Sequence, residues 1–260
     1  MSKKLSENEK NTNTEIKAVF IFLFIICIIA GYIIIQLEND SKKINLNNDF
    51  KDNSISNTNT DNNNKSSSSG YPQRIVPKDK PIIYIYSPQT KKVSVRLGNP
   101  QYLSHTYPKY IKGWNVTANP DGTLIDNSTG RKLYALYWEG KSLPKDTSMN
   151  EGFCIKGEDT IKFLEEKLEI LGLNERETEE FIIYWLPKME NNNYNYIRFE
   201  TIEEQNQAMP LNINPKPDSL IRIMMDWKGL DNKIEVKEQV LQSPKREGYT
   251  VVEWGGSELK

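Results

Sequence analysis

The sequence predicts an α+β protein: a mainly antiparallel β domain with two or three short helices, preceded by one transmembrane helix. Three observations lead to this prediction. Residues 18–35 form a stretch of eighteen residues without a charge, and residues 39–70 are dominated by Asn and Ser. The rest of the chain alternates apolar and polar residues in short runs that end at Gly, Pro or Asn, which is typical of antiparallel strands joined by turns.

Residues 17–37 are predicted to form a single transmembrane helix. A helix over the uncharged stretch, Ala18–Ile35, covers roughly 27 Å at about 1.5 Å per residue, which nearly matches a bilayer core of about 30 Å. The residues that follow this stretch offer no small-x-small cleavage site. We therefore expect an uncleaved anchor and not a signal peptide.

The flanking lysines and the position of the anchor predict its orientation. Four lysines precede the uncharged stretch and three follow it closely, which favours a cytoplasmic N-terminus by a small margin. An anchor this near the N-terminus normally sends the long C-terminal part across the membrane. We expect a cell-membrane protein with residues 1–16 as a cytoplasmic tail and the C-terminal domain outside. The opposite topology, with a cytosolic domain, is the alternative.

Residues 38–70 are predicted to be a disordered linker, because ten Asn and seven Ser between 39 and 70 leave too little apolar area to bury. Residues 71–260 are then one extracytoplasmic domain, long enough to bury a core without disulfides. It holds 26 Lys or Arg and 27 Asp or Glu, so its net charge of −1 predicts no nucleic-acid partner. Cys27 and Cys154 are not expected to pair.

The first half of the domain, residues 80–156, is predicted to be an antiparallel β unit. Four runs have the alternation or the β-branched and aromatic content of strands: Ile82–Tyr86, Val93–Leu97, Trp114–Ala118 and Leu133–Trp138. Asn119–Gly122 predicts a turn, since Pro120 fixes φ and Gly122 permits a positive φ. Asn127–Gly130 predicts another.

The second half is predicted to contain helices as well as strands. Gly157–Gly172 is expected to be a helix whose apolar face recurs at helical spacing: Ile161, Leu164, Leu168 and Leu171. Asn174 is expected to cap a second helix, with Glu177 at the capping-box position. Thr201–Gln207 is expected to be a third, short helix.

The apolar run Phe181–Leu186 is ambiguous between helix and strand, and its aromatic and β-branched content with Pro187 favours a strand. Tyr196–Phe199 would be its hairpin partner. Three further strands are expected to close the domain as a meander: Leu220–Trp227, Ile234–Leu241 and Tyr249–Trp254. A second hypothesis divides the domain into two lobes, 80–156 and 157–256.

Four motifs lie across nearly all of residues 80–256: KP-x-IY-x-Y, PDG-x-L, WEG and VEWGG, at Lys80–Tyr86, Pro120–Leu124, Trp138–Gly140 and Val252–Gly256. Together they resemble a family of uncharacterised bacterial membrane-anchored domains, which has a shorter version in fungal proteins. One departure is Ser87, which separates Tyr86 from Pro88 where the family usually has Tyr-Pro. The resemblance implies a genuine domain, and it implies no catalytic residues because no activity is known for the family.

Several classes of catalytic and metal site have no motif in this chain. No P-loop, GxSxG, HExxH or CxxC pattern is present, and one histidine excludes an all-histidine zinc site. We therefore expect no cofactor and no metal site. His105 is expected to be an ordinary surface or strand-edge residue, and Cys154 a small buried one.

The sharpest catalytic hypothesis uses two carboxylates, Glu139 and Glu253, each beside a tryptophan at a strand end. An indole can raise the pKa of a neighbouring carboxyl by desolvation. Glycosidases use two carboxylates that flank the scissile glycosidic bond. A cell-wall glycan hydrolase is therefore the alternative function. Spacing alone does not bring the two glutamates together, so no catalytic residue is assigned and a non-enzyme is favoured.

Trp138, Trp254 and Tyr137 are the candidate ligand-binding residues. Their rings offer flat faces for sugars or anchors for a protein partner, although a large β core also needs aromatic bulk. The favoured function is a single-pass membrane-anchored protein that presents a binding or interaction domain outside the cell. Its expected partners are the membrane through residues 17–37, and a cell-wall glycan or a surface protein.

Overall fold

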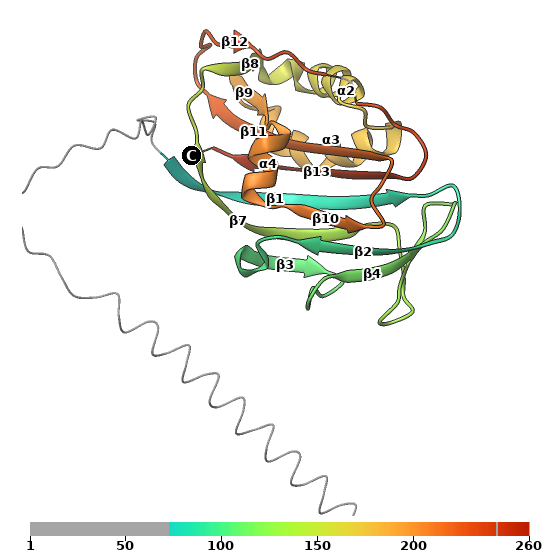
Figure 1. Ribbon diagram of the computed structural model, residues 1–260. Helices are drawn as coiled ribbons and strands as arrows, with labels where there is room; N and C mark the ends of the chain where they lie inside the picture. The colour runs from blue at the N-terminus through green and yellow to red at the C-terminus, as the bar shows by residue number, and fades with distance from the viewer. Residues whose placement is uncertain (1–72, 243, 260) are drawn as a thin grey trace, which may run out of the picture. The chain divides into compact units, whose positions relative to one another are not determined.

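The structure, a computed structural model, describes residues 73–242 and 244–259 (Figure 1). They belong to one compact unit, Ser68–Lys260. The predicted cytoplasmic tail, transmembrane helix and linker, residues 1–70, lie outside the described part of the chain. Within that part, every helix is too short or too polar to cross a bilayer.

The described residues form a mixed α+β fold with mostly antiparallel sheets and three helices, which confirms the predicted class. The helices are α2 (Thr160–Ile170), α3 (Glu175–Met189) and α4 (Ile202–Ala208). The larger sheet contains β1 (Gln73–Tyr86), β3 (Leu103–Tyr107), β7 (Leu136–Asp146), β8 (Glu151–Lys156), β9 (Tyr194–Phe199), β11 (Ser219–Leu230), β12 (Lys237–Glu238) and β13 (Thr250–Glu258). The smaller sheet contains β2 (Lys91–Leu97), β4 (Trp114–Ala118), β5 (Leu124–Asp126), β6 (Lys132–Leu133) and β10 (Leu211–Asn214).

The large sheet has the strand order β12-β8-β9-β11-β13-β1-β7-β3. Its neighbours are antiparallel except for two parallel pairs, β11 with β13 and β12 with β8. The small sheet, in the order β10-β2-β4-β5-β6, is antiparallel throughout. Strand β3 is the last strand of the large sheet, so its outer edge has no neighbouring strand among the described residues.

The large sheet has an apolar core on each of its two faces. Successive side chains on a strand point to opposite faces, so a single strand contributes to both cores. On β1, Ile82 and Tyr84 belong to a core cluster that includes the buried residues of α2 and α3. Ile83 and Ile85 belong to a second cluster with the buried residues of the small sheet. The molecule therefore has three layers: a helix layer of α2 and α3, the large sheet, and the small sheet (Figure 1). Helix α4 lies on the small-sheet side, where its Asn206 accepts a hydrogen bond from Arg222.

The helix layer does not extend over the β3 end of the large sheet. Among the described residues, no side chain of β7 or β3 belongs to the helix-side core cluster. The helix-side positions of these two strands are therefore not part of the apolar core beneath α2 and α3. Tyr137 and Glu139 occupy such positions on β7, and each keeps part of its surface exposed.

The short-range signals in the sequence produce the predicted local structures. The amide N–H of Gly122 donates to the carbonyl of Asn119 at 3.0 Å, and Gly122 has φ +80°. Asn174 and Glu177 form both hydrogen bonds of a capping box at the start of α3. Gly172 follows the end of α2 and has φ +91°. A residue with a side chain rarely adopts this φ, which is why glycine is favoured at this position after a helix.

The prediction of a strand at Phe181–Leu186 is wrong, since this run lies inside α3. Phe181, Trp185 and Met189 recur every four residues and are all fully buried, so they form one helical stripe against the sheet. Pro187 is accommodated within the last turn of the helix. A short apolar run carries no period of its own, and the packing of α3 decided its conformation.

The predicted hairpin and closing meander are also wrong. Strand β9 pairs with β8 and β11, and not with the run in α3. Strands β11 and β13 are parallel neighbours, so the chain between them must cross over. Among the described residues of this connection, β12 is the one strand, and it lies at the far edge of the sheet. The short strand β10 forms in a proline-rich segment, between Pro210 and Pro215.

The two-lobe hypothesis is not supported, because one sheet takes strands from both 80–156 and 157–256. The predicted face of the first helix is right in part. Leu164 and Leu168 are buried, but Ile161 is 44% exposed and Phe163 is buried instead. The apolar face predicted from Ile161 is therefore rotated around the helix axis relative to the face that packs against the sheet.

Candidate functional site

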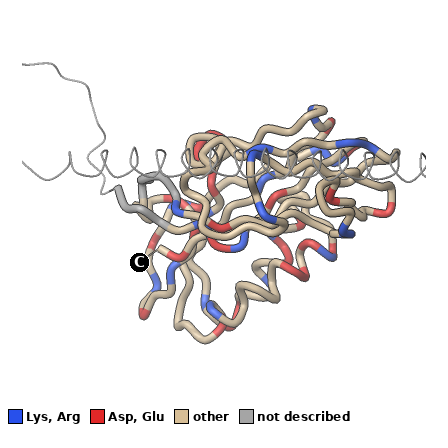
Figure 2. Tube along the Cα trace, turned by 90° about the horizontal axis from the view of Figure 1, so that it is seen from below, with Lys and Arg blue, Asp and Glu red and all other residues tan. Residues whose placement is uncertain are grey.

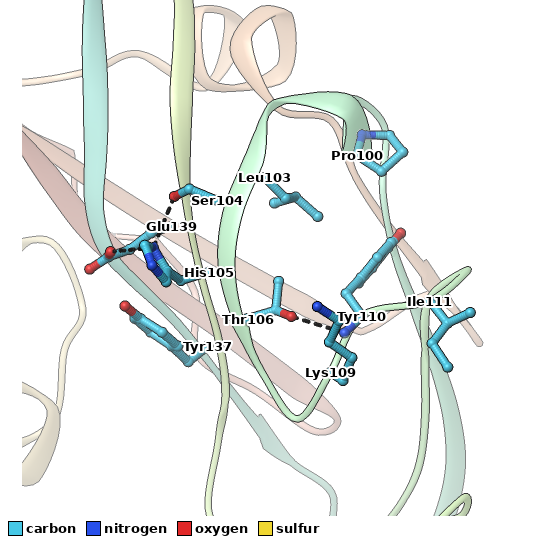
Figure 3. A pocket seen from close by; sticks show the side chains of 10 residues that line it. All are labelled: Pro100, Leu103, Ser104, His105, Thr106, Lys109, Tyr110, Ile111, Tyr137 and Glu139. Atoms are coloured by element: carbon cyan, nitrogen blue, oxygen red, sulfur yellow. Dashed lines mark hydrogen bonds and ion pairs between the residues drawn. The ribbon is translucent and has the colours of Figure 1, made fainter. Parts of the chain in front are cut away.

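An open cleft of about 600 Å³ follows the outer edge of β3 (Figure 3). We call it the β3 cleft. Its lining is a mixture of aliphatic, hydroxyl, aromatic and charged side chains: Pro100, Leu103, Ser104, His105, Thr106, Lys109, Tyr110, Ile111, Tyr137 and Glu139. Figure 3 shows His105, Tyr137 and Glu139 gathered on one side of the β3 ribbon, and Thr106 and Tyr110 on the other.

Glu139 is the centre of the polar contacts on the helix side of the β3 cleft. Its Oε1 accepts a hydrogen bond from the backbone N–H of Lys80 at 3.4 Å, and its Oε2 lies 3.5 Å from Nδ1 of His105. The side chain remains 25% exposed. Because a carboxylate offers about four acceptor positions, Glu139 can accept hydrogen bonds from a ligand in addition to these contacts.

Lys80 brings a cation to the same place. Its Nζ lies 5.9 Å from the ring centroid of Tyr137 and 5.4 Å from that of Tyr184, distances at which a ring face attracts a cation. Its backbone has φ +60°, which is uncommon outside glycine, at an irregularity in the pairing of β1 with β7. Burial, together with a hydrogen bond to Glu139, raises the pKa of Tyr137, so this hydroxyl keeps its proton as a donor.

His105 does not form a catalytic relay with its neighbours. Its Nδ1 lies 3.2 Å from Oγ of Ser104 and 3.5 Å from Oε2 of Glu139. A nucleophile–base–carboxylate relay needs the serine on one ring nitrogen and the carboxylate on the other. Here both groups approach the same nitrogen, and the imidazole side chain is 71% exposed. The arrangement is suited to hydrogen bonding and not to activating Ser104.

The second predicted carboxylate, Glu253, lies in the protein interior with 0% exposure. Its Oε2 accepts a hydrogen bond from Nε of Arg222 at 2.7 Å, and its Oε1 accepts one from Nε1 of Trp138 at 2.9 Å. Trp138 and Glu139 are successive residues of β7, so they point to opposite faces. The large sheet therefore separates Glu139 from Glu253, and the two carboxylates do not flank one ligand.

The two candidate tryptophans are core residues. Trp138 is 1% exposed and Trp254 is 0% exposed. The ring of Trp254 packs edge-on against Phe181 at 5.2 Å between centroids, under the helix layer. Neither indole offers a face to a sugar or a partner. Of the three predicted ligand-binding aromatics, only Tyr137 lines the β3 cleft.

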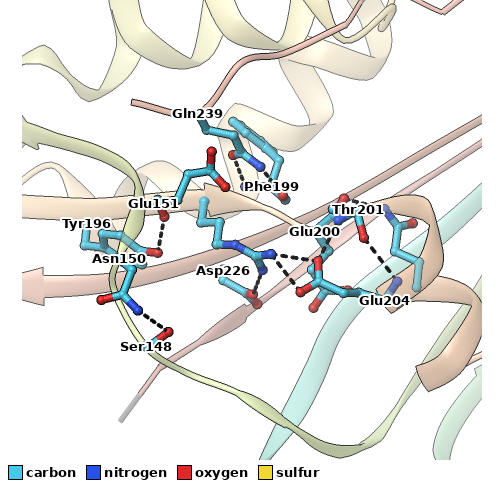
Figure 4. Close-up of polar contacts among 12 residues, drawn as sticks. Ser148, Asn150, Glu151, Tyr196, Phe199, Glu200, Thr201, Glu204, Asp226 and Gln239 are labelled. Atoms are coloured by element: carbon cyan, nitrogen blue, oxygen red, sulfur yellow. Dashed lines mark hydrogen bonds and ion pairs between the residues drawn. The ribbon is translucent and has the colours of Figure 1, made fainter. Parts of the chain in front are cut away.

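A second group of polar contacts joins α4 and the segment after β11 to the large sheet (Figure 4). Nη2 of Arg198 donates to both carboxylate oxygens of Glu204 at 2.7 and 2.8 Å, and Nη1 lies 3.7 Å from Asp226. The side-chain amide of Gln239 exchanges two hydrogen bonds with the backbone of Phe199, at 2.6 and 2.9 Å. Arg198 and Gln239 make these contacts within the protein, so we interpret both side chains as structural.

Cys154 has no catalytic partner in this arrangement. Its Sγ accepts a hydrogen bond from the backbone N–H of Ile234 at 3.4 Å. It lies on β8, while the histidine of the chain lies on β3, near the opposite end of the large sheet. In the described part of the chain, no group of three or more His, Cys, Asp or Glu residues could hold a metal ion.

Sequence reasoning missed Lys80 and Tyr184 as members of the site. Lys80 is the first residue of the KP-x-IY-x-Y motif. Its positive φ was not predictable, because glycine or asparagine is the residue expected at such a φ. Tyr184 was assigned to a strand within Phe181–Leu186, whereas on α3 it reaches toward Lys80.

Comparison with known proteins adds no assignment to this geometry. No protein-family model matches the sequence, and no curated protein or solved structure matches it. The residues of the β3 cleft are therefore the basis for assigning a function.

Proposed function

We propose that the protein is a single-pass membrane-anchored binding protein whose domain, outside the cell, holds cell-wall glycan in the β3 cleft. In this proposal residues 17–37 anchor the chain and residues 38–70 space the domain from the membrane. The observation that carries the ligand assignment is the grouping of Tyr137, Glu139 and Lys80 beside an open strand edge.

The chemistry of this group fits a polyhydroxylated ligand. The ammonium of Lys80 is a donor, and Glu139 is an acceptor for sugar hydroxyls. The hydroxyl of Tyr137 donates its proton to Glu139 and can accept a hydrogen bond from the sugar through its oxygen. A tyrosine ring combines an apolar face with a polar tip, which suits a ligand that has both. Since the cleft is open along β3, a polymer can pass through it without its ends having to enter.

The same geometry favours binding over hydrolysis. The carboxylate needed as a second catalytic group, Glu253, is buried on the other side of the large sheet. His105 approaches Ser104 and Glu139 through one nitrogen and cannot relay a proton between them. A surface protein is the alternative occupant, and the test below separates it from glycan.

Replacing Glu139 by Gln together with Tyr137 by Phe should reduce retention of the purified full chain on insoluble cell-wall glycan by about 10–100-fold. Tyr137→Phe removes a hydroxyl, and Glu139→Gln removes the charge and replaces one acceptor oxygen by an NH2 donor. Hydrogen bonds that involve a charged group contribute about 1.5–3 kcal/mol, where 1.4 kcal/mol is tenfold. Retention is measured by co-sedimentation in detergent, with release of reducing sugar followed in the same samples. We expect no release by the wild-type chain.

Tyr134→Ala is the matched control, because Tyr134 is 50% exposed and does not line the β3 cleft. It should leave retention unchanged. Equal retention of all three proteins would contradict the glycan assignment. Capture of a membrane protein in place of glycan, lost in the double variant, would assign the β3 cleft to a protein partner.

Protease added to intact cells that express the full chain should degrade the domain and leave a membrane-bound N-terminal fragment. This follows from an anchor at residues 17–37 with the N-terminus in the cytoplasm. Immunoblotting with a tag at each end measures the result. A domain that resists protease until the cells are lysed would reverse the topology, and a chain recovered in the soluble fraction would remove the anchor.

A further inference from the structure

The charges of the domain are segregated between its layers. Residues 87–133, which supply four of the five small-sheet strands, contain seven Lys or Arg and two Asp or Glu, a net charge of +5. Residues 158–190, which contain α2 and α3, hold ten acidic and four basic residues, a net charge of −6. The net charge of the whole chain, −1, conceals this separation. The charged positions can be followed in Figure 2.

The cations of residues 87–133 outnumber the acidic side chains near them, and only Lys132 lies close enough to Asp121 to add to the hydrogen bonds that lower the pKa of that carboxyl. They are Lys91, Lys92, Arg96, Lys109, Lys112, Arg131 and Lys132, and among the described residues none of them forms a salt bridge. Asp126 is already occupied, because it accepts hydrogen bonds from Ser128 and Thr129. All seven except Lys91 are exposed. The six exposed cations form what we call the basic face. Lys91 is not part of it, because its Nζ lies over the ring of the buried Tyr249, on the inward side of β2.

An exposed apolar side chain stands among these cations. Ile111 is 81% exposed and lies in the loop 108–113 between Lys109 and Lys112. An isoleucine this exposed contributes nothing to the core. An apolar side chain flanked by lysines is the combination by which peripheral proteins contact a lipid surface, where the cations meet phosphates and the apolar group enters the acyl boundary.

The same loop borders a hollow of about 400 Å³ on the outer side of the small sheet. Three cations line it: Arg96 from β2, with Lys109 and Lys112 from the loop. The side chain of Arg96 packs against the backbone of Gly113, which has φ +131°, so the loop and β2 form one surface. The hollow is large enough for a phosphate group. Its three cations are donors that bind phosphate, and they outnumber the one carboxylate in its lining, Asp126, which accepts hydrogen bonds from Ser128 and Thr129.

We infer that the basic face docks on anionic phospholipid, with a headgroup phosphate in the hollow beside Arg96 and Ile111 in the acyl boundary. Charge complementarity selects this partner, because the face is cationic and the helix layer is acidic. Docking would turn α2 and α3 away from the bilayer. The inference is independent of the glycan proposal, and it does not require the anchor, although an anchor would hold the basic face near lipid.

The expected effect is set by the number of cations at the surface. Each Lys or Arg close to an anionic membrane increases partitioning by about fivefold. Replacing Arg96 and Lys112 by Gln should therefore reduce the docked fraction relative to the undocked fraction by about 25-fold. Raising the ionic strength to about 1 M, where the Debye length is about 3 Å, should also reduce the docked fraction.

The test places an environment-sensitive fluorophore on the full chain in vesicles. The label is attached at Ile111→Cys in a chain that carries Cys27→Ala and Cys154→Ala. We expect a blue shift, and quenching by nitroxide-labelled lipid, in vesicles that contain phosphatidylglycerol but not in vesicles of phosphatidylcholine alone. The same label at Ile183→Cys is the matched control, since Ile183 is 65% exposed on the acidic helix layer, and it should show neither effect.

Three results would overturn the inference. The first is an equal blue shift at positions 111 and 183. The second is a shift that occurs equally in phosphatidylcholine, or that survives Arg96→Gln with Lys112→Gln. The third is an equal response to soluble hexametaphosphate with neutral vesicles, which would make the hollow a site for soluble polyanions. Flotation of the chain with neutral vesicles reports the anchor separately, so failure of the anchor is distinguishable from failure of docking.

Discussion

Replacing Glu253 by Ala should lower the free energy of unfolding by about 3–5 kcal/mol, the cost typical of breaking a buried ion pair by removing one partner. The change leaves the guanidinium of Arg222 without its carboxylate at a site where its side chain is only 1% exposed. Its remaining contacts are neutral, the side-chain oxygen of Asn206 and the carbonyl of Met209, each at 2.9 Å. Neither can compensate a buried positive charge.

The loss of Glu253 also affects the partner on β7. The indole N–H of Trp138 donates to Oε1 of Glu253, and Trp138 is 1% exposed. Without this acceptor a buried donor is left unsatisfied, which adds to the loss of stability. The pair therefore ties β13, β11 and β7 together on the small-sheet side of the large sheet.

Urea unfolding followed by tryptophan fluorescence measures this effect. Glu158→Ala is the matched control, because it breaks the exposed pair with Lys156 and should change the midpoint little. The double variant Arg222→Met with Glu253→Leu should recover the part of the loss that comes from the unpaired guanidinium, since it buries no unpaired charge. The indole N–H of Trp138 still lacks its acceptor in this variant, so recovery should be incomplete. If Glu253→Ala behaved like Glu158→Ala, Glu253 would be exposed and the catalytic hypothesis would have to be reconsidered.

Replacing Trp254 by Ala should lower the free energy of unfolding by about 3–5 kcal/mol, the usual range for truncating a large buried aromatic. Trp254 is fully buried and stacks with Tyr84 at 6.4 Å between ring centroids, in addition to its contact with Phe181. Truncation opens a cavity between the large sheet and α3 that close-packed neighbours fill only in part. Trp254→Phe keeps an aromatic ring and should cost less.

The same urea titration measures this prediction, with Tyr134→Ala as the exposed-aromatic control. Glycan retention of the folded fraction of Trp254→Ala should equal that of the wild type, because Trp254 does not line the β3 cleft. A variant with unchanged stability and lost retention would return Trp254 to the role of a ligand-binding residue.

The β3 cleft and the basic face meet at the loop 108–113, since Lys109 and Ile111 line both the cleft and the hollow beside Arg96. If the basic face docks on lipid, the β3 cleft opens next to the membrane surface. A ligand in the cleft would then be held close to the bilayer. The two proposals remain separable, because Glu139→Gln leaves the cations of the basic face in place.

Local structure was predictable from the sequence because its causes lie within a few residues. The capping box of Asn174 and Glu177, the turn at Asn119–Gly122 and the helix end at Gly172 depend on side-chain hydrogen bonds or on φ alone. The alternation of Val93–Leu97 likewise predicted its strand. Tyr137 and Glu139 were identified as candidates from their place in an aromatic strand, and both line the β3 cleft.

The sequence by itself therefore determined the fold class, the turns, the caps and the alternation of the strands. Only the tertiary structure decided that Phe181–Leu186 is helical, that β11 and β13 are parallel, and that Glu253 is an interior partner of Arg222. The physical reason is the distance along the chain over which each interaction acts. Caps and turns are made by neighbours, whereas strand pairing, burial and buried charge pairs join residues far apart, and their free energy is not contained in any local pattern.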